Sequence, residues 1–132
     1  MNKKYKSVKF YIVLIVLLYL FLGIIMFINK TNEDKESIKQ KMSVCPPIYN
    51  STKMEGILFD REVELNTVGK GLVYLTLNNG KCMTIKGFTA TNLSGSVILG
   101  DFLQIGDLIN KQIGDNNIYV YRNNKEHRFI MN

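Results

Sequence analysis

The chain has 132 residues, 46% of them hydrophobic, and a formal net charge of +6 at pH 7. Five lysines beside one apolar segment supply most of that charge, so residues 31–132 are nearly neutral, with twelve basic and eleven acidic residues. Because these later basic residues are scattered singly and do not alternate with aromatic ones, we expect no nucleic-acid partner.

Residues 10–28 (FYIVLIVLLYLFLGIIMFI) are nineteen consecutive residues without a charge. A helix needs about 20 apolar residues to cross the hydrocarbon core of a bilayer, so this run predicts a transmembrane helix. The alternative is a cleaved signal peptide, whose apolar region is typically ~7–15 residues long and ends at small residues. Here a longer run is followed by Asn29-Lys30-Thr31, which favours an uncleaved anchor in the lipid bilayer.

The lysines around this run predict its orientation. Lys3, Lys4, Lys6 and Lys9 precede it, whereas Lys30 and then an acidic-rich stretch follow it. Since Lys and Arg concentrate on the cytoplasmic side of a span, residues 1–9 are predicted to be a basic cytoplasmic tail. The protein is then a single-pass membrane protein whose C-terminal part is extracytoplasmic.

Residues 29–47 are predicted to be a charged stalk or linker. Thr31 and Asp34 have the spacing of a capping box, and Ile38 and Met42 form one apolar pair, which favours a short helical or fraying stalk. Pro46-Pro47 prevents a helix from continuing, because proline lacks the amide hydrogen. We therefore expect the folded domain to comprise residues 48–132.

This domain carries short β-type runs separated by turn residues. Residues 72–78 and 81–88 flank Asn79-Gly80, a pair that accepts the positive φ angles of a tight hairpin turn. Residues 117–122 and 125–131 flank Asn123-Asn124, which also tolerates left-handed geometry. These two hairpins are the clearest predictions within the domain.

Four weaker strands are predicted at residues 56–59, 62–65, 96–99 and 102–105. About six to eight short strands at this spacing indicate a small all-β domain, either a barrel-sandwich fold or a small β-barrel or sandwich. No helical pattern of ten or more residues interrupts the strands, which disfavours an α/β architecture. The predicted fold is one N-terminal transmembrane helix plus this domain.

The two cysteines, Cys45 and Cys82, both lie on the predicted extracytoplasmic side. Oxidation is permitted there, and a domain of about 85 residues has a thin core, so a disulfide would add stability. The alternative is that Cys82 is a small buried apolar residue of its strand and Cys45 a free thiol. The sequence leaves both readings open.

No motif for catalysis or for metal binding stands out. His127 is the only histidine and is expected at the surface, and the two cysteines stand far apart, which excludes paired-histidine and C-x-x-C zinc sites. Glu62 and Glu64 would share one strand face, but their alternation with apolar residues describes a half-solvated strand better than a catalytic pair. We predict no catalytic residue, no cofactor and no metal ligand.

Three Gly-Asp pairs follow each other closely: Gly100-Asp101, Gly106-Asp107 and Gly114-Asp115. Glycine permits a tight turn and aspartate caps nearby amides, so such pairs separate strands. Calcium binding is the alternative, although the spacing matches neither an EF-hand nor the calcium nonapeptide repeat. We expect a structural turn at Gly106 and Asp107, as at Asn79 and Gly80, and hence only a mild effect of Asp107→Asn.

Residues 105–121 (IGDLINKQIGDNNIYVY) resemble the Gly-Asp-x-Ile-x-Lys hairpin of lipoyl-like and barrel-sandwich domains. Such domains occur on envelope adaptor proteins and as non-catalytic β folds in the lysostaphin-type peptidase family. With its N-terminal anchor, the whole chain resembles small single-pass bacterial envelope proteins that end in such a domain. The resemblance implies a fold, but neither a lipoyl or biotin carrier nor a peptidase, because the attachment-lysine context and the zinc ligands are missing.

The favoured function is a membrane-anchored, non-enzymatic binding or assembly module of the cell envelope, whose β domain docks an envelope protein. The alternative is an accessory enzyme, or a degenerate relative of the lysostaphin-type peptidases, with an active site that no motif reveals.

Overall fold

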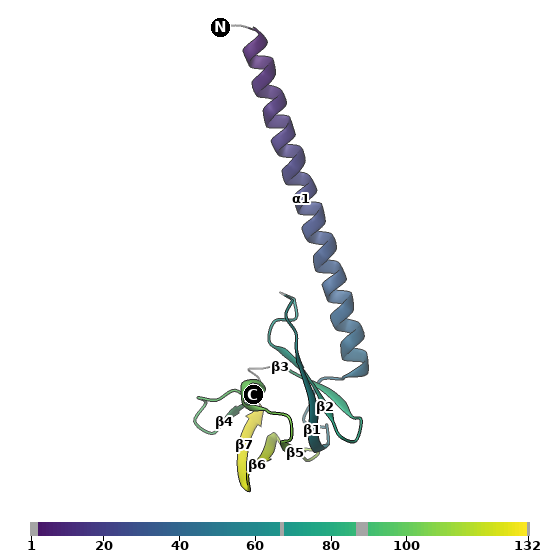
Figure 1. Cartoon of the computed structure of the whole chain (residues 1–132), viewed down its shortest axis with the longest axis vertical. Helices are drawn as coiled ribbons and strands as arrows, with labels where there is room; N and C mark the ends of the chain where they lie inside the picture. Colours follow the sequence, from purple (N-terminus) through teal and green to yellow (C-terminus); the bar gives the residue numbers. More distant parts are fainter. Residues whose placement is uncertain (1–2, 67, 87–89, 132) are drawn as a thin grey trace.

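The first third of the chain forms one long helix. The structure, a computed structural model, describes residues 3–66, 68–86 and 90–131, with side chains from Val8 onward. Helix α1 comprises Lys3–Val44 and extends as a rod away from the β domain (Figure 1). At 1.5 Å per residue it is about 63 Å long. Its segment Val8–Val44 contains a stretch that is long and apolar enough to cross a membrane.

The backbone helix is not interrupted at the predicted boundary between the transmembrane helix and the stalk. Thr31 lies in the middle of α1, and its hydroxyl donates a hydrogen bond to the carbonyl of Phe27 at 2.8 Å, so the capping-box prediction is wrong. Extending an existing helix adds one hydrogen bond per residue without a new nucleus, and Glu, Lys and Gln are good helix formers. The stalk therefore continues the helix until Pro46-Pro47 ends it.

The β domain is one antiparallel sheet of seven strands within the described residues, in the order β3-β2-β1-β5-β6-β7-β4. The strands are β1 Met54–Val63, β2 Leu72–Leu77, β3 Cys82–Lys86, β4 Ala90–Asn92, β5 Leu108–Lys111, β6 Asn117–Arg122 and β7 Lys125–Met131. A short helix, α2 (Leu99–Phe102), lies between β4 and β5. The predicted fold, one long helix followed by a small all-β domain, is confirmed.

Strand β1 divides the sheet into two halves. Its first half pairs with β5 and its second half with β2, and the register shifts between Leu58 and Asp60. This irregularity bends the sheet, so that β1–β3 and β4–β7 form two differently oriented layers in Figure 1. The inner side chains of both halves meet in one core, which includes Leu58, Leu75, Ile109, Val120 and Phe129.

Both predicted hairpins are confirmed, since β2 pairs with β3 and β6 pairs with β7. Gly80 supplies a positive φ of 80° in the first turn, and Asn123 and Asn124 supply φ angles of 51° and 61° in the second. Left-handed conformations of this kind are what glycine and asparagine tolerate best.

The weaker strand predictions are confirmed only in part. Residues 56–59 and 62–65 belong largely to the single long strand β1. The predictions at 96–99 and 102–105 are wrong, because Leu99 and Leu103 turn inward four residues apart and are buried around α2. Strands β4 and β5 are not among the predicted ones. Their few residues form strands because neighbours distant in sequence supply the hydrogen bonds.

We predict that Gly106→Val lowers the free energy of unfolding by more than the ~1 kcal/mol of an ordinary glycine replacement. Gly106 has φ +95°, and an added Cβ would meet no atom within 4 Å, so the cost is backbone strain and not a clash. Gly106→Asn is the matched control and should lose less, because asparagine tolerates positive φ. Urea unfolding followed by tyrosine fluorescence measures both; equal stability of the valine variant and the parent would contradict the turn.

Candidate functional site

The last turns of α1 and strands β1–β3 form a charged junction. The Nζ atom of Lys41 lies 2.7 Å from Oε1 of Glu62 and 3.2 Å from Oε2 of Glu64. The hydroxyl of Tyr74 donates to the same Glu64 oxygen at 3.3 Å. Glu62 and Glu64 do come together, as strand alternation suggested, but the charge they face is a lysine of the helix.

The protonation states of Lys41 and Glu64 are those of a structural ion pair. Hydrogen bonding to Glu62 raises the pKa of Lys41. Burial raises the pKa of Glu64, but hydrogen bonds from Lys41 and from the amide of Asn66 outweigh burial and hold the pKa below its ordinary value. Lys41 and Glu64 are therefore both charged at neutral pH. A general acid needs a pKa near the working pH, whereas the pKa of Glu64 lies below its ordinary value.

An apolar contact lies next to the charged one. Ile38 of α1 is buried against the loop between β1 and β2. A Cβ on Gly69 would lie 2.8 Å from Cδ1 of Ile38 and 2.5 Å from Cγ of Glu64. Only glycine therefore allows this loop to approach the helix so closely.

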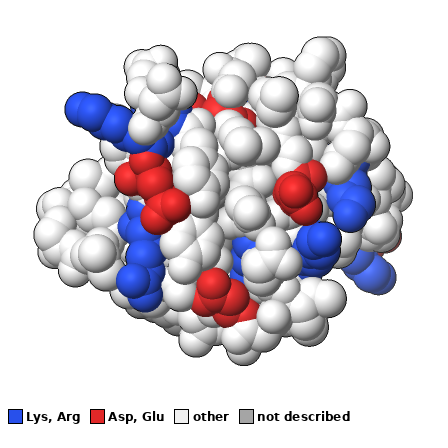
Figure 2. Space-filling model, turned by 90° about the horizontal axis from the view of Figure 1, so that it is seen from below, with Lys and Arg blue, Asp and Glu red and all other residues white. Residues whose placement is uncertain are grey.

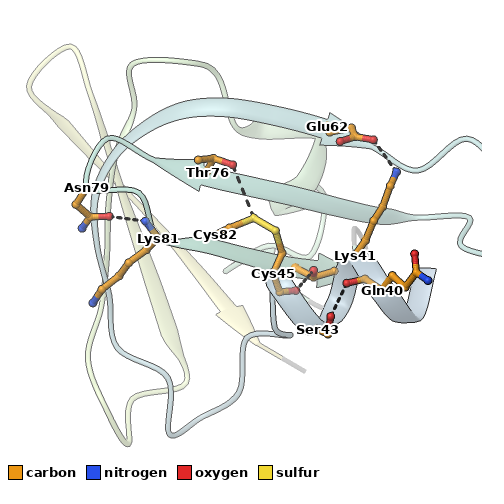
Figure 3. Close-up of a disulfide and its surroundings, with 10 residues drawn as sticks. Gln40, Lys41, Ser43, Cys45, Glu62, Thr76, Asn79, Lys81 and Cys82 are labelled. Atoms are coloured by element: carbon orange, nitrogen blue, oxygen red, sulfur yellow. Dashed lines mark hydrogen bonds and ion pairs between the residues drawn. A yellow bond between two sulfur atoms is a disulfide. The ribbon is translucent and has the colours of Figure 1, made fainter. Parts of the chain in front are cut away.

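A disulfide joins the end of α1 to β3. Cys45 and Cys82 are bonded, with 4.6 Å between their Cα atoms, so the reading of two free thiols is not what the structure shows. Figure 3 shows this bond and the Lys41–Glu62 ion pair as two links between the helix end and the sheet.

The chain directly after the disulfide is held to β3 by its backbone. Pro47 forms a parallel bridge to Thr84, whose amide donates to the Pro46 carbonyl at 2.9 Å. The amide of Ile48 donates to the Thr84 carbonyl at 3.0 Å. Residues 45–48 and α1 thus cover the outer face of β2 and β3, which explains why Tyr74 and Thr84 are buried although they point away from the core.

A second ionic cluster closes the other half of the domain. Arg122 of β6 binds Asp107 through two bonds, from Nε to Oδ1 at 2.7 Å and from Nη2 to Oδ2 at 2.6 Å. Asp107 also accepts the amide of Gln104 at 2.8 Å, so it does cap the turn. The guanidinium lies 4.3 Å from the ring centroid of Phe102 and donates to the carbonyl of that residue.

Asp107 therefore does more than the sequence predicted. The side chain of this aspartate is only 2% exposed. Burial raises the pKa of Asp107, but Arg122 and the Gln104 amide outweigh it and leave the pKa below its ordinary value. We therefore replace the expected mild effect of Asp107→Asn with a larger one, because the substitution would leave the charge of Arg122 without its partner. His127, expected at the surface, is half-buried, with its ring centroid 4.7 Å from that of Phe102.

Lys111 is a fully buried cation. Its Nζ donates to the carbonyls of Asn50 and Thr52 at 3.0 Å each and to that of Gln112 at 3.2 Å. Burial lowers the pKa of Lys111. The three N–H donors of the Lys111 ammonium group thus have three carbonyl acceptors. The side chain links the segment before β1 to β5, and it has no access to a ligand because it is fully buried.

An apolar cleft of about 490 Å³ opens where the end of α1 meets the two halves of the sheet. Its apolar lining includes Met42, Pro47, Ile48, Leu72, Ile85 and Met131, and Asn50 and Asn116 add polar groups. This volume lies in the ~300–1,000 Å³ range of small-molecule pockets. Lys86 and Ala90 at its edge flank residues 87–89, which lie outside the described part of the chain.

The predicted site residues serve local structure. Asn79 accepts the amide of Lys81 at 3.1 Å and donates to the carbonyl of Glu55 at 2.9 Å. Asp115 accepts the amide of Asn117 at 2.9 Å, and Asp101 lies exposed in α2. Across residues 3–66, 68–86 and 90–131, no group of three or more His, Cys, Asp or Glu side chains is arranged to hold a metal ion.

Sequence reasoning missed Lys41, Lys111 and Arg122. A signal existed for Lys111, because it is two positions after Ile109 in a strand and therefore shares the inward face. No local signal pairs Lys41 with Glu62 or Arg122 with Asp107, because these contacts join residues 21 and 15 positions apart.

No family model, curated protein or solved structure matches this chain. The likeness of residues 105–121 to lipoyl-like hairpins therefore stays a prediction.

We predict that Asp107→Asn lowers the free energy of unfolding by about 2–3 kcal/mol at pH 7, because it breaks a buried ion pair whose arginine keeps some contact with water. The exposed Asp101→Asn is the control and should change it by less than about 0.5 kcal/mol. Because the folded pKa of Asp107 is depressed, its stabilisation is present above the ordinary aspartate pKa of about 4 and is lost as the pH falls through the folded pKa.

Denaturation curves recorded from pH 7 down to pH 2 test this difference. The parent should lose more stability than Asp107→Asn over the acid range. Parallel pH profiles would mean that Asp107 is not ion-paired.

We also predict that replacing both cysteines, Cys45→Ser with Cys82→Ser, lowers the free energy of unfolding by about 3–4 kcal/mol. The two residues are 37 positions apart, so the bond closes a long loop in the unfolded chain. Urea unfolding of the oxidised parent, the reduced parent and the variant provides the comparison. The reduced parent should match the variant; no difference between oxidised and reduced parent would show that the bond does not form.

Proposed function

We propose that this chain is a membrane-anchored, non-enzymatic binding or assembly module of a bacterial cell envelope. Residues 10–28 cross the membrane, residues 1–9 stay in the cytoplasm, and the β domain is held outside to dock a partner protein. The observation that carries the proposal is a single helix, Lys3–Val44, which continues from the apolar run into a fixed attachment on the β domain.

The exposure of the apolar run supports a membrane location. The large apolar side chains of residues 10–28 are between 38% and 72% exposed, with Ile25 the least and Tyr19 and Met26 the most exposed. A helix that is apolar on every face and uncovered by its own protein needs lipid around it. The run is about 28 Å long as a helix, close to the ~30 Å hydrocarbon core.

The disulfide supports the predicted orientation. Bonds such as Cys45–Cys82 persist in oxidising compartments outside the cytoplasm. Together with the four lysines ahead of the span, this favours a cytoplasmic N-terminus.

The helix also determines how the domain is presented. Residues 29–44 remain helical and contact with the domain begins at Ile38, so residues 29–37 form a spacer of about 14 Å between the predicted membrane boundary and the domain. A helical spacer holds a fixed distance, whereas a flexible linker samples many. Such an arrangement suits a module that must meet its partner at a set height above the membrane.

The surface and the ionic clusters support a protein partner and a role without chemistry. On the face turned away from the N-terminus of α1, basic and acidic side chains are interspersed among uncharged ones (Figure 2). Mixed charge of this kind suits a protein surface better than a polyanion. The charged groups at Lys41, Asp107 and Lys111 each have structural partners, as described above.

We predict that the full-length chain sediments with membranes, resists extraction by carbonate, and keeps its N-terminal residues. A signal sequence would instead be removed, so mass spectrometry of the membrane fraction separates the two. A C-terminal alkaline phosphatase fusion should be active, because the enzyme folds only outside the cytoplasm. An inactive fusion, together with an active cytoplasmic reporter at the same site, would reverse the topology.

A further inference from the structure

The outer face of the half-sheet formed by β1, β5, β6 and β7 is uncovered. In the other half-sheet, α1 and residues 45–48 cover the corresponding face and bury Tyr74 and Thr84. Here Ile57 and Leu108 pair across β1 and β5 and are 44% and 42% exposed, although both are large and apolar. Exposed apolar pairs on a sheet face are typical of an interaction surface.

The strand registers arrange the side chains of this face in two rows that run across the four strands. The first row is Glu55, Asn110, Tyr119 and Arg128, and the second is Ile57, Leu108, Tyr121 and Glu126. The first row thus begins with an acid on β1 and ends with a base on β7, with polar and aromatic groups between them. We name the two rows together the open face.

We infer that the open face binds the same face of a second copy of this chain. A two-fold axis parallel to the strands, between β5 and β6, would place β1 of one copy over β7 of the other. Glu55, which lies 3.5 Å from Lys53 of its own chain, then also faces Arg128 of the second copy, and the reverse contact repeats it, as symmetry requires. Leu108 meets Tyr121, and Asn110 meets Tyr119, so these contacts are complementary in charge and in polarity.

The remaining contact of the second row is compatible with this packing. Ile57 would meet Glu126 of the second copy. Glu126 lies beside Tyr121 across the β6–β7 pair and is exposed. Its carboxylate stays in water while the aliphatic part of the side chain covers Ile57.

The direction of α1 agrees with this symmetry axis. From Cys45 through Lys41 to Ile38, the helix contacts Cys82, Glu62 and Gly69 in turn. These positions succeed one another along the strands, so α1 runs along the sheet, and β1 and β7 also lie roughly along α1 in Figure 1. Rotation about an axis parallel to the strands therefore keeps both helices pointing to the same side.

This agreement matters because two copies in one membrane must share one direction. The inference rests on the proposed membrane anchoring in this respect.

The open face is also small: four strands about 4.8 Å apart and about 20 Å long give roughly 400 Å² per copy, below the ~800 Å² of a standard stable interface. We therefore expect a weak dimer in solution that membrane confinement strengthens by raising the effective concentration.

The test uses the full chain in isolated membranes. Asn110→Cys places the only free thiol beside the two-fold axis, because both native cysteines are in the disulfide. A short bis-maleimide should then link two copies. Leu65→Cys is the control, since this position is 91% exposed on the loop between β1 and β2 and should give no dimer.

Charge reversal tests the arrangement. In the Asn110→Cys background, Glu55→Arg or Arg128→Glu alone places like charges opposite each other twice per dimer and should lower the linked fraction about tenfold. The double reversal restores opposite charges and should return the fraction to within about twofold of the parent. Both residues are exposed, and thermal melts check that the variants stay folded.

The outcomes separate the two proposals. A chain that is absent from the membrane fraction would overturn both the anchoring and the dimer. A membrane-bound chain that links no better at Asn110→Cys than at Leu65→Cys would overturn the dimer alone. The proposed self-complementary face would also be overturned if the single charge reversals left the linked fraction unchanged, or if the double reversal did not restore it.

Discussion

The attachment of the helix end to the outer face of β1–β3 is the constraint on which the rest of this structure depends. Ile38 and Lys41 lie on one stripe of α1, because residues three apart share a helix face, and Cys45 follows directly after the helix ends at Val44. Each uses a different interaction: an apolar contact with Gly69, an ion pair with Glu62, and a covalent bond to Cys82. Together they orient the helix relative to the sheet as no single contact could.

This attachment makes the two halves of the sheet unequal. The half that carries α1 is buried on both of its faces, which is why nearly every residue of β2 is inaccessible to solvent. The other half keeps the alternation of a sheet with one solvent face, as β5 and β6 show. The open face is the side that the proposed dimer would use, and the attached helix fixes where that side points.

Charged side chains are used throughout the domain as structural ties. Asp107 and Arg122 close the end of the core beside α2, and Lys111 joins the segment before β1 to β5. Buried charges are tolerated only when their hydrogen bonds are satisfied, and those of Lys111 and Asp107 are. In a domain with a thin apolar core, such ties add directional contacts that apolar packing alone does not provide.

The sequence alone determined those features that depend on neighbouring residues. The apolar run at residues 10–28 had to be a helix long and apolar enough to cross a membrane, and Asn79-Gly80 and Asn123-Asn124 had to turn, because these properties follow from composition and local backbone preference. Tertiary structure decided the rest. The disulfide, the burial of the helical turn at Leu99, and the partners of Lys41 and Arg122 all depend on residues that are distant in sequence. Their energies come from packing and charge pairing between elements, which no local pattern encodes.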